Sequence, residues 1–264
     1  MITTKNKIAI LVGAGAVENA WKPVLNCFRE INGDETDSDT ANFLFAKSVC
    51  AMRLYSKSPK GAKQLQEEQE TVGMIKDVIC DSLRLAQKKG VLKPRKEFTT
   101  MLDKFVLSNP NNLFGFVSTN WDTVIDAEAD RWVKEKYLDI ESAKVFHIHG
   151  SIEEHEHIYL PSETSMENYR SDDENDKIGY AHFATYELLK EANVIILYGL
   201  SLDPLDAELS LLLNGTFASS KTLREVIIVN PNYKVVRKRV KILLFRKTGI
   251  AVRCFHPENL EIEF

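Results

Sequence analysis

The stretch KIAILVGAGA, residues 7–16, decides the fold of this chain. Five apolar residues follow Lys7 and lead directly into a turn that contains Gly13 and Gly15. Such a run is too short and too uniformly apolar for a surface helix, and it is typical of a parallel strand buried on both faces. The glycines allow a tight turn at which backbone N–H groups can approach a phosphate closely. The stretch therefore predicts an α/β protein with an anion-binding turn after its first strand.

Five further runs rich in Val, Ile and Phe repeat this pattern, and helical patterns separate the later ones. Parallel strands joined by helical crossovers form a doubly wound sheet, which binds ligands at the carboxyl ends of its strands. We therefore predict a mainly parallel, six-stranded, Rossmann-like sheet. The predicted strands cover residues 7–13, 113–119, 143–149, 193–199, 225–230 and 250–255.

The long segment between the first two strands has apolar residues at helical spacing over 41–52 and 72–86. We predict a helical module at about 33–108, inserted into and packed on the sheet of a single domain, 1–264. Residues 153–177 are acidic and rich in turn-forming residues, so they predict a loop in which His155 and His157 are solvated.

The composition fits one α/β domain in a reducing compartment. Of 264 residues 44% are apolar, and 34 Lys plus Arg against 38 Asp plus Glu give a net charge of -4. This charge gives no reason to expect binding to nucleic acid or to an anionic membrane. The four cysteines form no CxxC pair, so no zinc ribbon of the usual spacing and no metal site is expected. With no run of about 18 apolar residues and no signal peptide, we expect a cytoplasmic protein.

Polar residues or glycines close five of the six predicted strands. The second strand ends in STNWD, with Thr119, Asn120 and Asp122, and the third ends in HIHGS, with His149. Because the carboxyl ends of parallel strands open into one crevice, an amide, a carboxylate and an imidazole are expected to converge there. Taken singly, each residue also fits an Asx turn, a helix cap or a His-Gly turn; taken together, they favour a site. The fourth and fifth strands add Gly199, Ser201, Asp203 and Asn230 to the same edge.

Other residues near this edge are expected to be structural. His147 predicts a hydrogen-bonded core histidine, Trp121 is expected to face into packing, and Cys254 is expected to be a buried, inert thiol. The basic residues of 234–241 predict a solvated helix face, with a subunit or nucleic-acid contact as the alternative.

The glycine turn is not specific by itself. The third glycine of the usual dinucleotide fingerprint would fall at Glu18, and no second strand follows at the spacing that brings an acid to the ribose. A hydride-transferring dehydrogenase is therefore disfavoured.

The motifs GAGA, STNWD, HIHGS, YGLSLD and VIIVNP, in this order, resemble those of the sirtuin-like, or silent information regulator, family. The likeness extends from Ile8 to the last strand and is closest to a zinc-free bacterial branch that looks like dedicated NAD hydrolases, including effectors of anti-phage defence. The resemblance implies NAD as substrate and ADP-ribose as product. It also implies a pyrophosphate cradle at Gly13, Ala14 and Gly15, a nicotinamide-ribose pocket at Thr119, Asn120 and Asp122, a catalytic His149, and an adenosine-ribose side at Gly199, Ser201 and Asn230.

The chain departs from this family in ways that keep alternatives open. It lacks the paired-cysteine zinc module of the protein-deacylating sirtuins, and the helical region takes its place. Val17 stands where a serine usually follows the glycines, and Trp21 stands where a glycine is expected. ADP-ribosyl transfer, deacylation, or a nucleotide-sensing or scaffold subunit without turnover are therefore alternatives to NAD hydrolysis.

Cleavage of the bond between nicotinamide and ribose C1′ builds oxocarbenium character on the sugar, so the site must orient the substrate. We expect Asn120 to hold the ribose hydroxyls or the attacking water, and Asp122 to accept from the nicotinamide amide or to support its loop. We expect His149, near its ordinary pKa of about 6.5, to accept a proton from water or a ribose hydroxyl. Because unregulated loss of NAD is toxic, control by a partner protein or by homo-oligomerisation is expected.

Overall fold

The computed structural model describes residues 5–32, 36–109, 111–137, 140–153, 158–245 and 247–264. Its main sheet contains β1 (Lys7–Val12), β4 (Leu113–Ser118), β5 (Val145–His147), β6 (Val194–Tyr198), β7 (Glu225–Val229), β8 (Ala251–His256) and β9 (Asn259–Glu263). The strands lie in the order β5-β4-β1-β6-β7-β8-β9, and all but β9 are parallel. Numbered along the chain, the parallel strands have the Rossmann order 3-2-1-4-5-6, so the order reverses between β1 and β6. The predicted doubly wound α/β fold is confirmed.

The sheet has one strand more than predicted. β9 pairs antiparallel with β8, with a register shift between Phe255 and His256. Only Leu260 of β9 is buried, so this strand lacks the uniformly apolar run that identified the six others. A separate two-stranded sheet pairs β2 (Val17–Glu18) with β3 (Lys93–Pro94).

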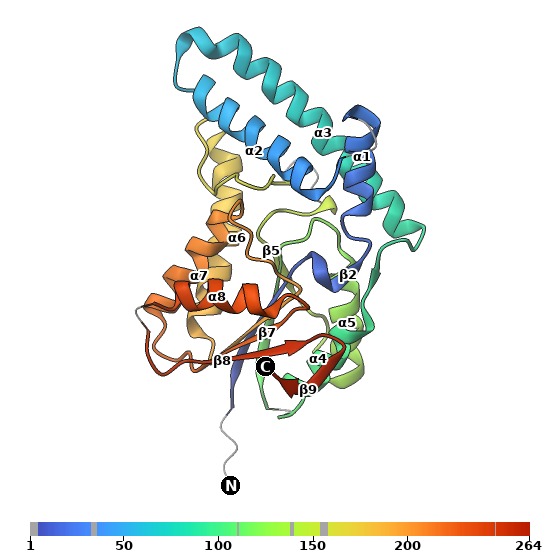
Figure 1. Cartoon of the computed structure of the whole chain (residues 1–264), viewed down its shortest axis with the longest axis vertical. Helices are drawn as coiled ribbons and strands as arrows, with labels where there is room; N and C mark the ends of the chain where they lie inside the picture. The colour runs from blue at the N-terminus through green and yellow to red at the C-terminus, as the bar shows by residue number, and fades with distance from the viewer. Residues whose placement is uncertain (1–4, 33–35, 110, 138–139, 154–157, 246) are drawn as a thin grey trace.

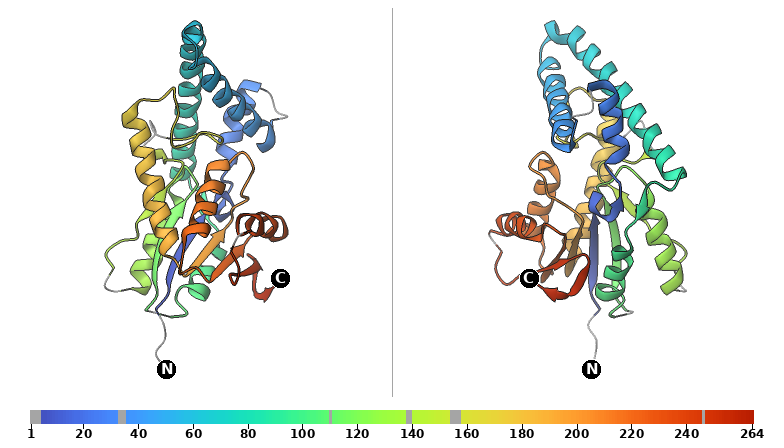
Figure 2. Two further views of the ribbon diagram at one scale, coloured as in Figure 1. Left: turned by 90° about the vertical axis from the view of Figure 1, so that its left-hand side faces the viewer. Right: turned by 45° about the vertical axis from the view of Figure 1, so that its right-hand side comes forward.

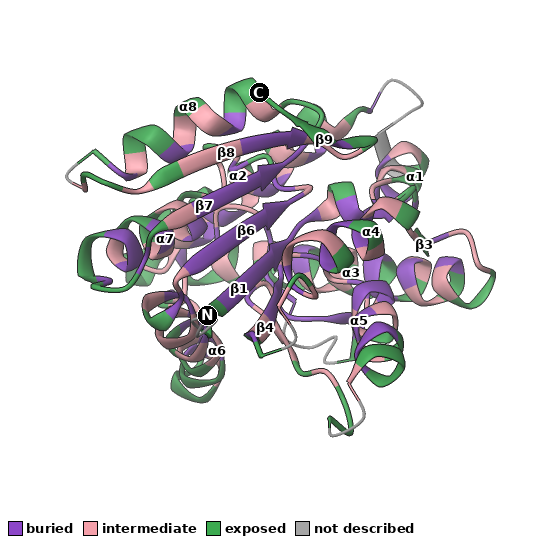
Figure 3. Cartoon of the chain, turned by 90° about the horizontal axis from the view of Figure 1, so that it is seen from below, coloured by how far each residue is buried: buried purple, intermediate pink, exposed green. Residues whose placement is uncertain are grey.

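Helices cover both faces of the sheet, which Figure 3 shows as buried strands between helices with exposed outer surfaces. On one side Ile8, Ile10 and Val12 join an apolar cluster with α4 (Lys96–Phe105) and α5 (Val124–Lys136). On the other side Ala9 and Leu11 join a cluster with α6 (Asp172–Glu191), α7 (Ala207–Ser219) and α8 (Tyr233–Leu243). The alternation follows from the two-residue period of a strand. Among the described residues, no helix is both long enough and apolar enough to cross a bilayer.

A helical part stands above the carboxyl edge of the sheet, as Figures 1 and 2 show. It contains α1 (Lys22–Asn32), α2 (Ser38–Tyr55) and α3 (Ala62–Lys88); two 3-10 turns, η1 (Ala14–Ala16) and η2 (Pro59–Gly61), precede α1 and α3. The range predicted for the module, 33–108, therefore omits α1, whose Phe28 packs edge-on against Phe45 of α2. The same range includes α4, which lies on the sheet with Phe98 packed edge-on against Tyr198 of β6.

The segment predicted as a loop, 153–177, ends in a helix. Ser171 caps α6 by accepting a hydrogen bond from the N–H of Glu174 at 3.2 Å, and three acidic residues occupy the first turn, where the helix dipole favours them. The acids that suggested a loop therefore belong partly to a helix start. His155 and His157, predicted to be solvated, lie outside the described residues.

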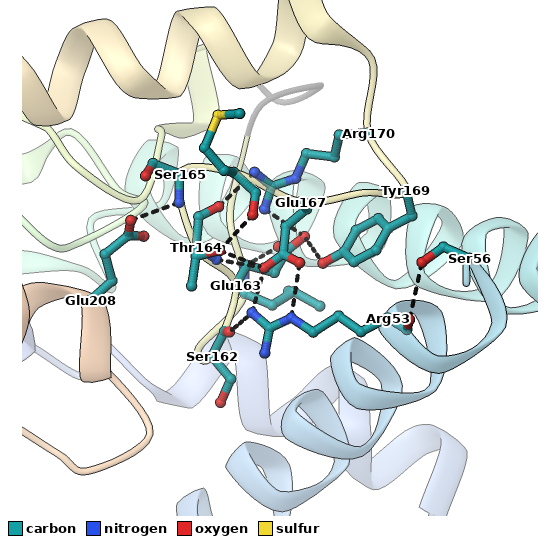
Figure 4. A network of polar contacts seen from close by, with 12 residues as sticks. Arg53, Ser56, Ser162, Glu163, Thr164, Ser165, Glu167, Tyr169, Arg170 and Glu208 are labelled. Atoms are coloured by element: carbon teal, nitrogen blue, oxygen red, sulfur yellow. Dashed lines mark hydrogen bonds and ion pairs between the residues drawn. The ribbon is translucent and has the colours of Figure 1, made fainter.

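The rest of this segment, residues 158–171, is fixed to the helical part by the ion pairs of two buried glutamates (Figure 4). Arg53 of α2 donates to both carboxylate oxygens of Glu167, with Nε 2.9 Å from Oε2. The same guanidinium donates to the Ser162 carbonyl at 2.6 Å. These bonds join α2 to a segment that is distant in sequence.

A second buried carboxylate, Glu163, joins the same segment to α3. Its oxygens lie 3.2 Å from Lys76 Nζ and 3.0 Å from Arg170 Nη2, and they accept bonds from the Leu160 N–H and the Tyr169 hydroxyl. Burial raises the pKa of Glu163, but the two cations and the N–H donor outweigh burial and hold it below its ordinary value. Glu163 is therefore ionised in the folded protein at neutral pH.

Substitution of Glu163 by Gln is expected to lower the free energy of unfolding by about 3–5 kcal/mol, because it removes the buried carboxylate that pairs with both Lys76 and Arg170. Denaturant unfolding at pH 7 measures this loss. Glu67→Gln is the control, since the side chains of Glu67 and its partner Lys63 are both largely exposed, and a change within about 0.5 kcal/mol is expected.

The same contact predicts a direction for the pH dependence of stability. Since the folded pKa of Glu163 is depressed, its contribution is present above the ordinary glutamate pKa and is lost as the pH falls through the lower, folded value. The difference in stability between the wild type and Glu163→Gln should therefore shrink in acid. A difference that stays constant down to the acid transition would contradict the assignment.

Candidate functional site

A cleft of about 830 Å³ opens at the carboxyl ends of the strands, where the strand order reverses between β1 and β6. Strand-end turns, α1, α2 and the segment 158–171 all contribute to its walls. The strand-end pattern and the family resemblance together predicted ten site residues, and all ten line this one cleft: Gly13, Ala14, Gly15, Thr119, Asn120, Asp122, His149, Gly199, Ser201 and Asn230. Asp203, which the pattern placed at the same edge, lines it too.

The turns after β1 and β6 touch backbone to backbone, and three glycines make this contact possible. A Cβ atom on Gly13 or Gly15 would lie 2.8 Å from backbone atoms of Gly199. Gly199 itself has φ +63°, and a Cβ atom there would lie 2.6 Å from the carbonyl carbon of Gly15. The N–H of Gly15 donates to the Gly199 carbonyl at 3.0 Å, and that of Gly13 donates to the Tyr198 carbonyl at 2.9 Å. These two glycine amides hold the turns together.

The loop after β6 is held by β7 and α8. The Nδ2 of Asn230 donates to the Leu200 carbonyl at 2.8 Å. Arg239 Nη1 donates to the carbonyls of Ser201 at 2.8 Å and Leu202 at 3.1 Å, where Leu202 has the unfavourable φ of 54°. Arg239 thus stabilises a strained loop at the cleft, in contrast to the solvated role expected for the basic residues of α8.

The residues after β4 continue the sheet edge toward the glycine turn. The N–H of Thr119 donates to the Val12 carbonyl at 2.9 Å, which extends the pairing of β4 with β1. The N–H of Asn120 donates to Ser118 Oγ at 3.1 Å, and Asn120 Nδ2 lies 3.5 Å from the Gly13 carbonyl. The buried amide of Asn120 is therefore placed beside the turn after β1.

Asp122 and Trp121 link this edge to neighbouring elements. Asp122 Oδ1 accepts from the Val124 N–H at 3.1 Å at the start of α5, and burial raises the pKa of Asp122 to about 6. Trp121 packs edge-on against Phe45, as expected of a packing residue, and its Nε1 donates to the Tyr159 carbonyl at 3.0 Å. Trp121 also lines the cleft, which its expected packing role did not include.

His147 is a hydrogen-bonded interior histidine, as predicted. Its Nδ1 lies 2.9 Å from the Asn120 carbonyl, and its Nε2 lies 3.0 Å from Asp126 Oδ1. Because both neighbours accept hydrogen bonds, both ring nitrogens must carry protons. Burial lowers the pKa of His147, but Asp126 outweighs burial and raises it above its ordinary value. The charged ring thereby holds the backbone carbonyl of Asn120 in place.

His149 forms a partly buried pair with Asp206. Its Nε2 lies 3.1 Å from Asp206 Oδ2, and Asp206 Oδ1 accepts from the Leu209 N–H at the start of α7. Burial lowers the pKa of His149, but the charge of Asp206 outweighs burial, so the pKa lies above its ordinary value. The expectation of an ordinary pKa for His149 is therefore wrong, because it left out this carboxylate.

Asp206, Tyr159 and Arg95 line the cleft but were not selected from the sequence. Asp206 stands in the same motif as Asp203 and directly precedes the apolar run of α7, so its position as a helix cap was the available signal. Tyr159 and Arg95 reach the cleft from segments without a strand-end pattern, and no local signal marks them.

Substitution of Asp206 by Asn is expected to lower the pKa of His149, because it removes the charge that stabilises the imidazolium. An NMR titration of the histidine ring signals measures this shift without any assumption about activity. Asp203→Asn is the matched control, since the Asp203 carboxylate accepts from the Leu205 N–H and is not the partner of His149. An unchanged His149 pKa in the Asp206 variant would rule out the pair.

The cleft combines an amide, buried carboxylates and a carboxylate-paired imidazole, which together can orient a sugar and accept a proton. Among the residues that the structure describes, no group of three or more His, Cys, Asp or Glu side chains is arranged to hold a metal ion. Comparison of the chain with protein-family models and with curated proteins gives no match.

Proposed function

We propose that this protein is a sirtuin-like NAD hydrolase that releases nicotinamide and ADP-ribose. The observation that carries the proposal is a single cleft that joins the glycine turn after β1, the amide of Asn120 and the His149–Asp206 pair. Its volume of about 830 Å³ falls within the range of about 300–1,000 Å³ that small-molecule and cofactor sites occupy. The cleft lies at the topological switch point, where doubly wound sheets bind dinucleotides.

The reaction breaks the bond from ribose C1′ to the nicotinamide nitrogen and forms a bond from C1′ to a water oxygen. The electron pair of the broken bond neutralises the pyridinium, and the water gives up one proton. With Nε2–H of His149 donating to Asp206, Nδ1 is the ring nitrogen available to accept that proton. Asp206 stabilises the resulting imidazolium, as the raised pKa of His149 indicates.

Asn120 and Asp122 serve the nicotinamide ribose in this proposal. The Ser118 hydroxyl and His147 fix the backbone of Asn120, and its buried side-chain amide lies beside the Gly13 carbonyl, so this amide can hold a ribose hydroxyl or the water with little loss of entropy. Asp122 has one oxygen engaged at the start of α5, and its second oxygen can accept from the nicotinamide amide. These roles require orientation more than nucleophilic strength.

The proposal predicts that the purified protein converts NAD to nicotinamide and ADP-ribose, and that His149→Ala and Asn120→Ala each lower turnover by about 10²–10⁴-fold. Chromatographic quantification of both products measures this. His256→Gln is the matched control, because His256 ends β8 outside the cleft, and its turnover should equal that of the wild type. Normal turnover in either alanine variant would remove that residue from the mechanism.

One alternative is that the protein binds the nucleotide without cleaving it. The segment 17–24, which runs from β2 into α1, brings the bulky Trp21 to the cleft, which favours a nucleotide-sensing or scaffold subunit. Tight binding of ADP-ribose without product release would identify this case. Transfer of ADP-ribose to protein, or formation of O-acyl-ADP-ribose, would instead identify a transferase or a deacylase.

Regulation belongs to the same proposal. A cytoplasmic enzyme that depletes NAD must be restrained, and a role as an effector of anti-phage defence would supply an activating signal. We propose that a partner protein or self-association controls turnover. Sedimentation of the protein at assay concentration, combined with the product assay, tests this: full activity of the isolated monomer would contradict it.

A further inference from the structure

The turn after β1 has few N–H groups left for a ligand. The amides of Gly13 and Gly15 donate to the carbonyls of Tyr198 and Gly199 at the end of β6. The Ala16 N–H donates to the Gly13 carbonyl, and the Val17 N–H donates to the Ala14 carbonyl. Four of the five amides at positions 13–17 are thus already engaged. A dinucleotide pyrophosphate carries two negative charges, and a cationic side chain can supply the counter-charge and the hydrogen-bond donors that this turn lacks.

Arg95 is brought to this turn from a distant part of the chain. The β2–β3 pairing sets Val17 opposite Pro94, and the N–H of Arg95 then donates to the Ala16 carbonyl at 2.9 Å. The Arg95 side chain is exposed and lines the cleft. Within the described part of the chain its guanidinium forms no hydrogen bond or ion pair. The backbone of Arg95 is therefore anchored beside η1, and its side chain is available to a ligand in the cleft.

The other cations of the cleft are less suited to this position. Arg239 uses Nη1 to hold the carbonyls of Ser201 and Leu202. Lys22 lies at the start of α1, beyond the two-stranded ribbon, and it offers a point charge without the planar fork of an arginine. Arginine donates two parallel hydrogen bonds to phosphate oxygens, which fits a bridging pyrophosphate.

We propose that Arg95 binds the pyrophosphate of the dinucleotide and supplies the counter-charge that the glycine turn lacks. This inference rests on the proposed function, because it requires a diphosphate ligand in the cleft. In this proposal the β2–β3 ribbon positions Arg95, which follows the helical part in the chain, at the edge of the sheet.

Calorimetric titration of wild type, Arg95→Gln and Lys96→Gln with ADP-ribose and with adenosine tests the inference. Arg95→Gln should weaken ADP-ribose binding by about 10- to 100-fold, the effect of one or two charge-assisted hydrogen bonds. Its adenosine binding and thermal midpoint should match the wild type, since adenosine carries no phosphate. Lys96→Gln removes a neighbouring exposed cation that does not line the cleft, so its ADP-ribose affinity should stay within about two-fold of the wild type.

These titrations distinguish a wrong assignment of Arg95 from a wrong hydrolase proposal. If the wild type binds ADP-ribose and Arg95→Gln binds it equally well, the pyrophosphate role of Arg95 is excluded and the hydrolase proposal stands. Equal losses in Arg95→Gln and Lys96→Gln would show a general charge effect and would also exclude it. If the wild type binds no ADP-ribose, the pyrophosphate role of Arg95 is also excluded, and the assay of NAD cleavage alone decides the hydrolase proposal.

Discussion

The backbone contact between the turns after β1 and β6 is the constraint on which the site depends. Gly13, Gly15 and Gly199 come so close that a Cβ atom on any of them would lie within 2.9 Å of the opposite backbone. The contact fixes the switch point of the sheet and therefore the floor of the cleft. It also engages two glycine amides that a phosphate would otherwise meet. A turn that looks like a phosphate cradle in sequence is here first a packing surface, which leaves fewer backbone N–H groups for a ligand.

The opposite wall of the cleft depends on buried charges instead of close backbone packing. In the segment 158–171, Glu167 pairs with Arg53 of α2, and Glu163 pairs with Lys76 of α3. The same segment contributes Tyr159 to the cleft. The N–H of Ser165 donates to Glu208 in the first turn of α7, two residues beyond Asp206. The same segment thus contacts the helical part and the helix that holds the partner of His149. Loss of these ion pairs would therefore weaken the contacts of this segment with both the helical part and α7.

The sequence reveals the sheet and its edge well, because both depend on local patterns. Uniform apolar runs identified the six parallel strands, and the residues that follow them converge for a topological reason that needs no side-chain detail. Patterns of this kind do not reveal contacts between distant segments. The pairing of His149 with Asp206 spans 57 positions, and Arg95 reaches the turn only through the β2–β3 ribbon. The exposed strand β9 was missed because a solvated edge strand has no apolar run.

The distribution of charge in the cleft fits the charge distribution of the proposed substrate. Carboxylates of Asp122 and Asp206 lie with His149 among the strand ends that serve the nicotinamide ribose in the proposal, where positive charge develops on the sugar. Arg95 lies beside the turn at Ala16, where the proposal places two negative phosphates. A ligand that is cationic at one end and anionic in the middle is oriented by such a field before any specific contact forms. Under the proposed function, a neutral nucleoside would gain nothing from this polarity.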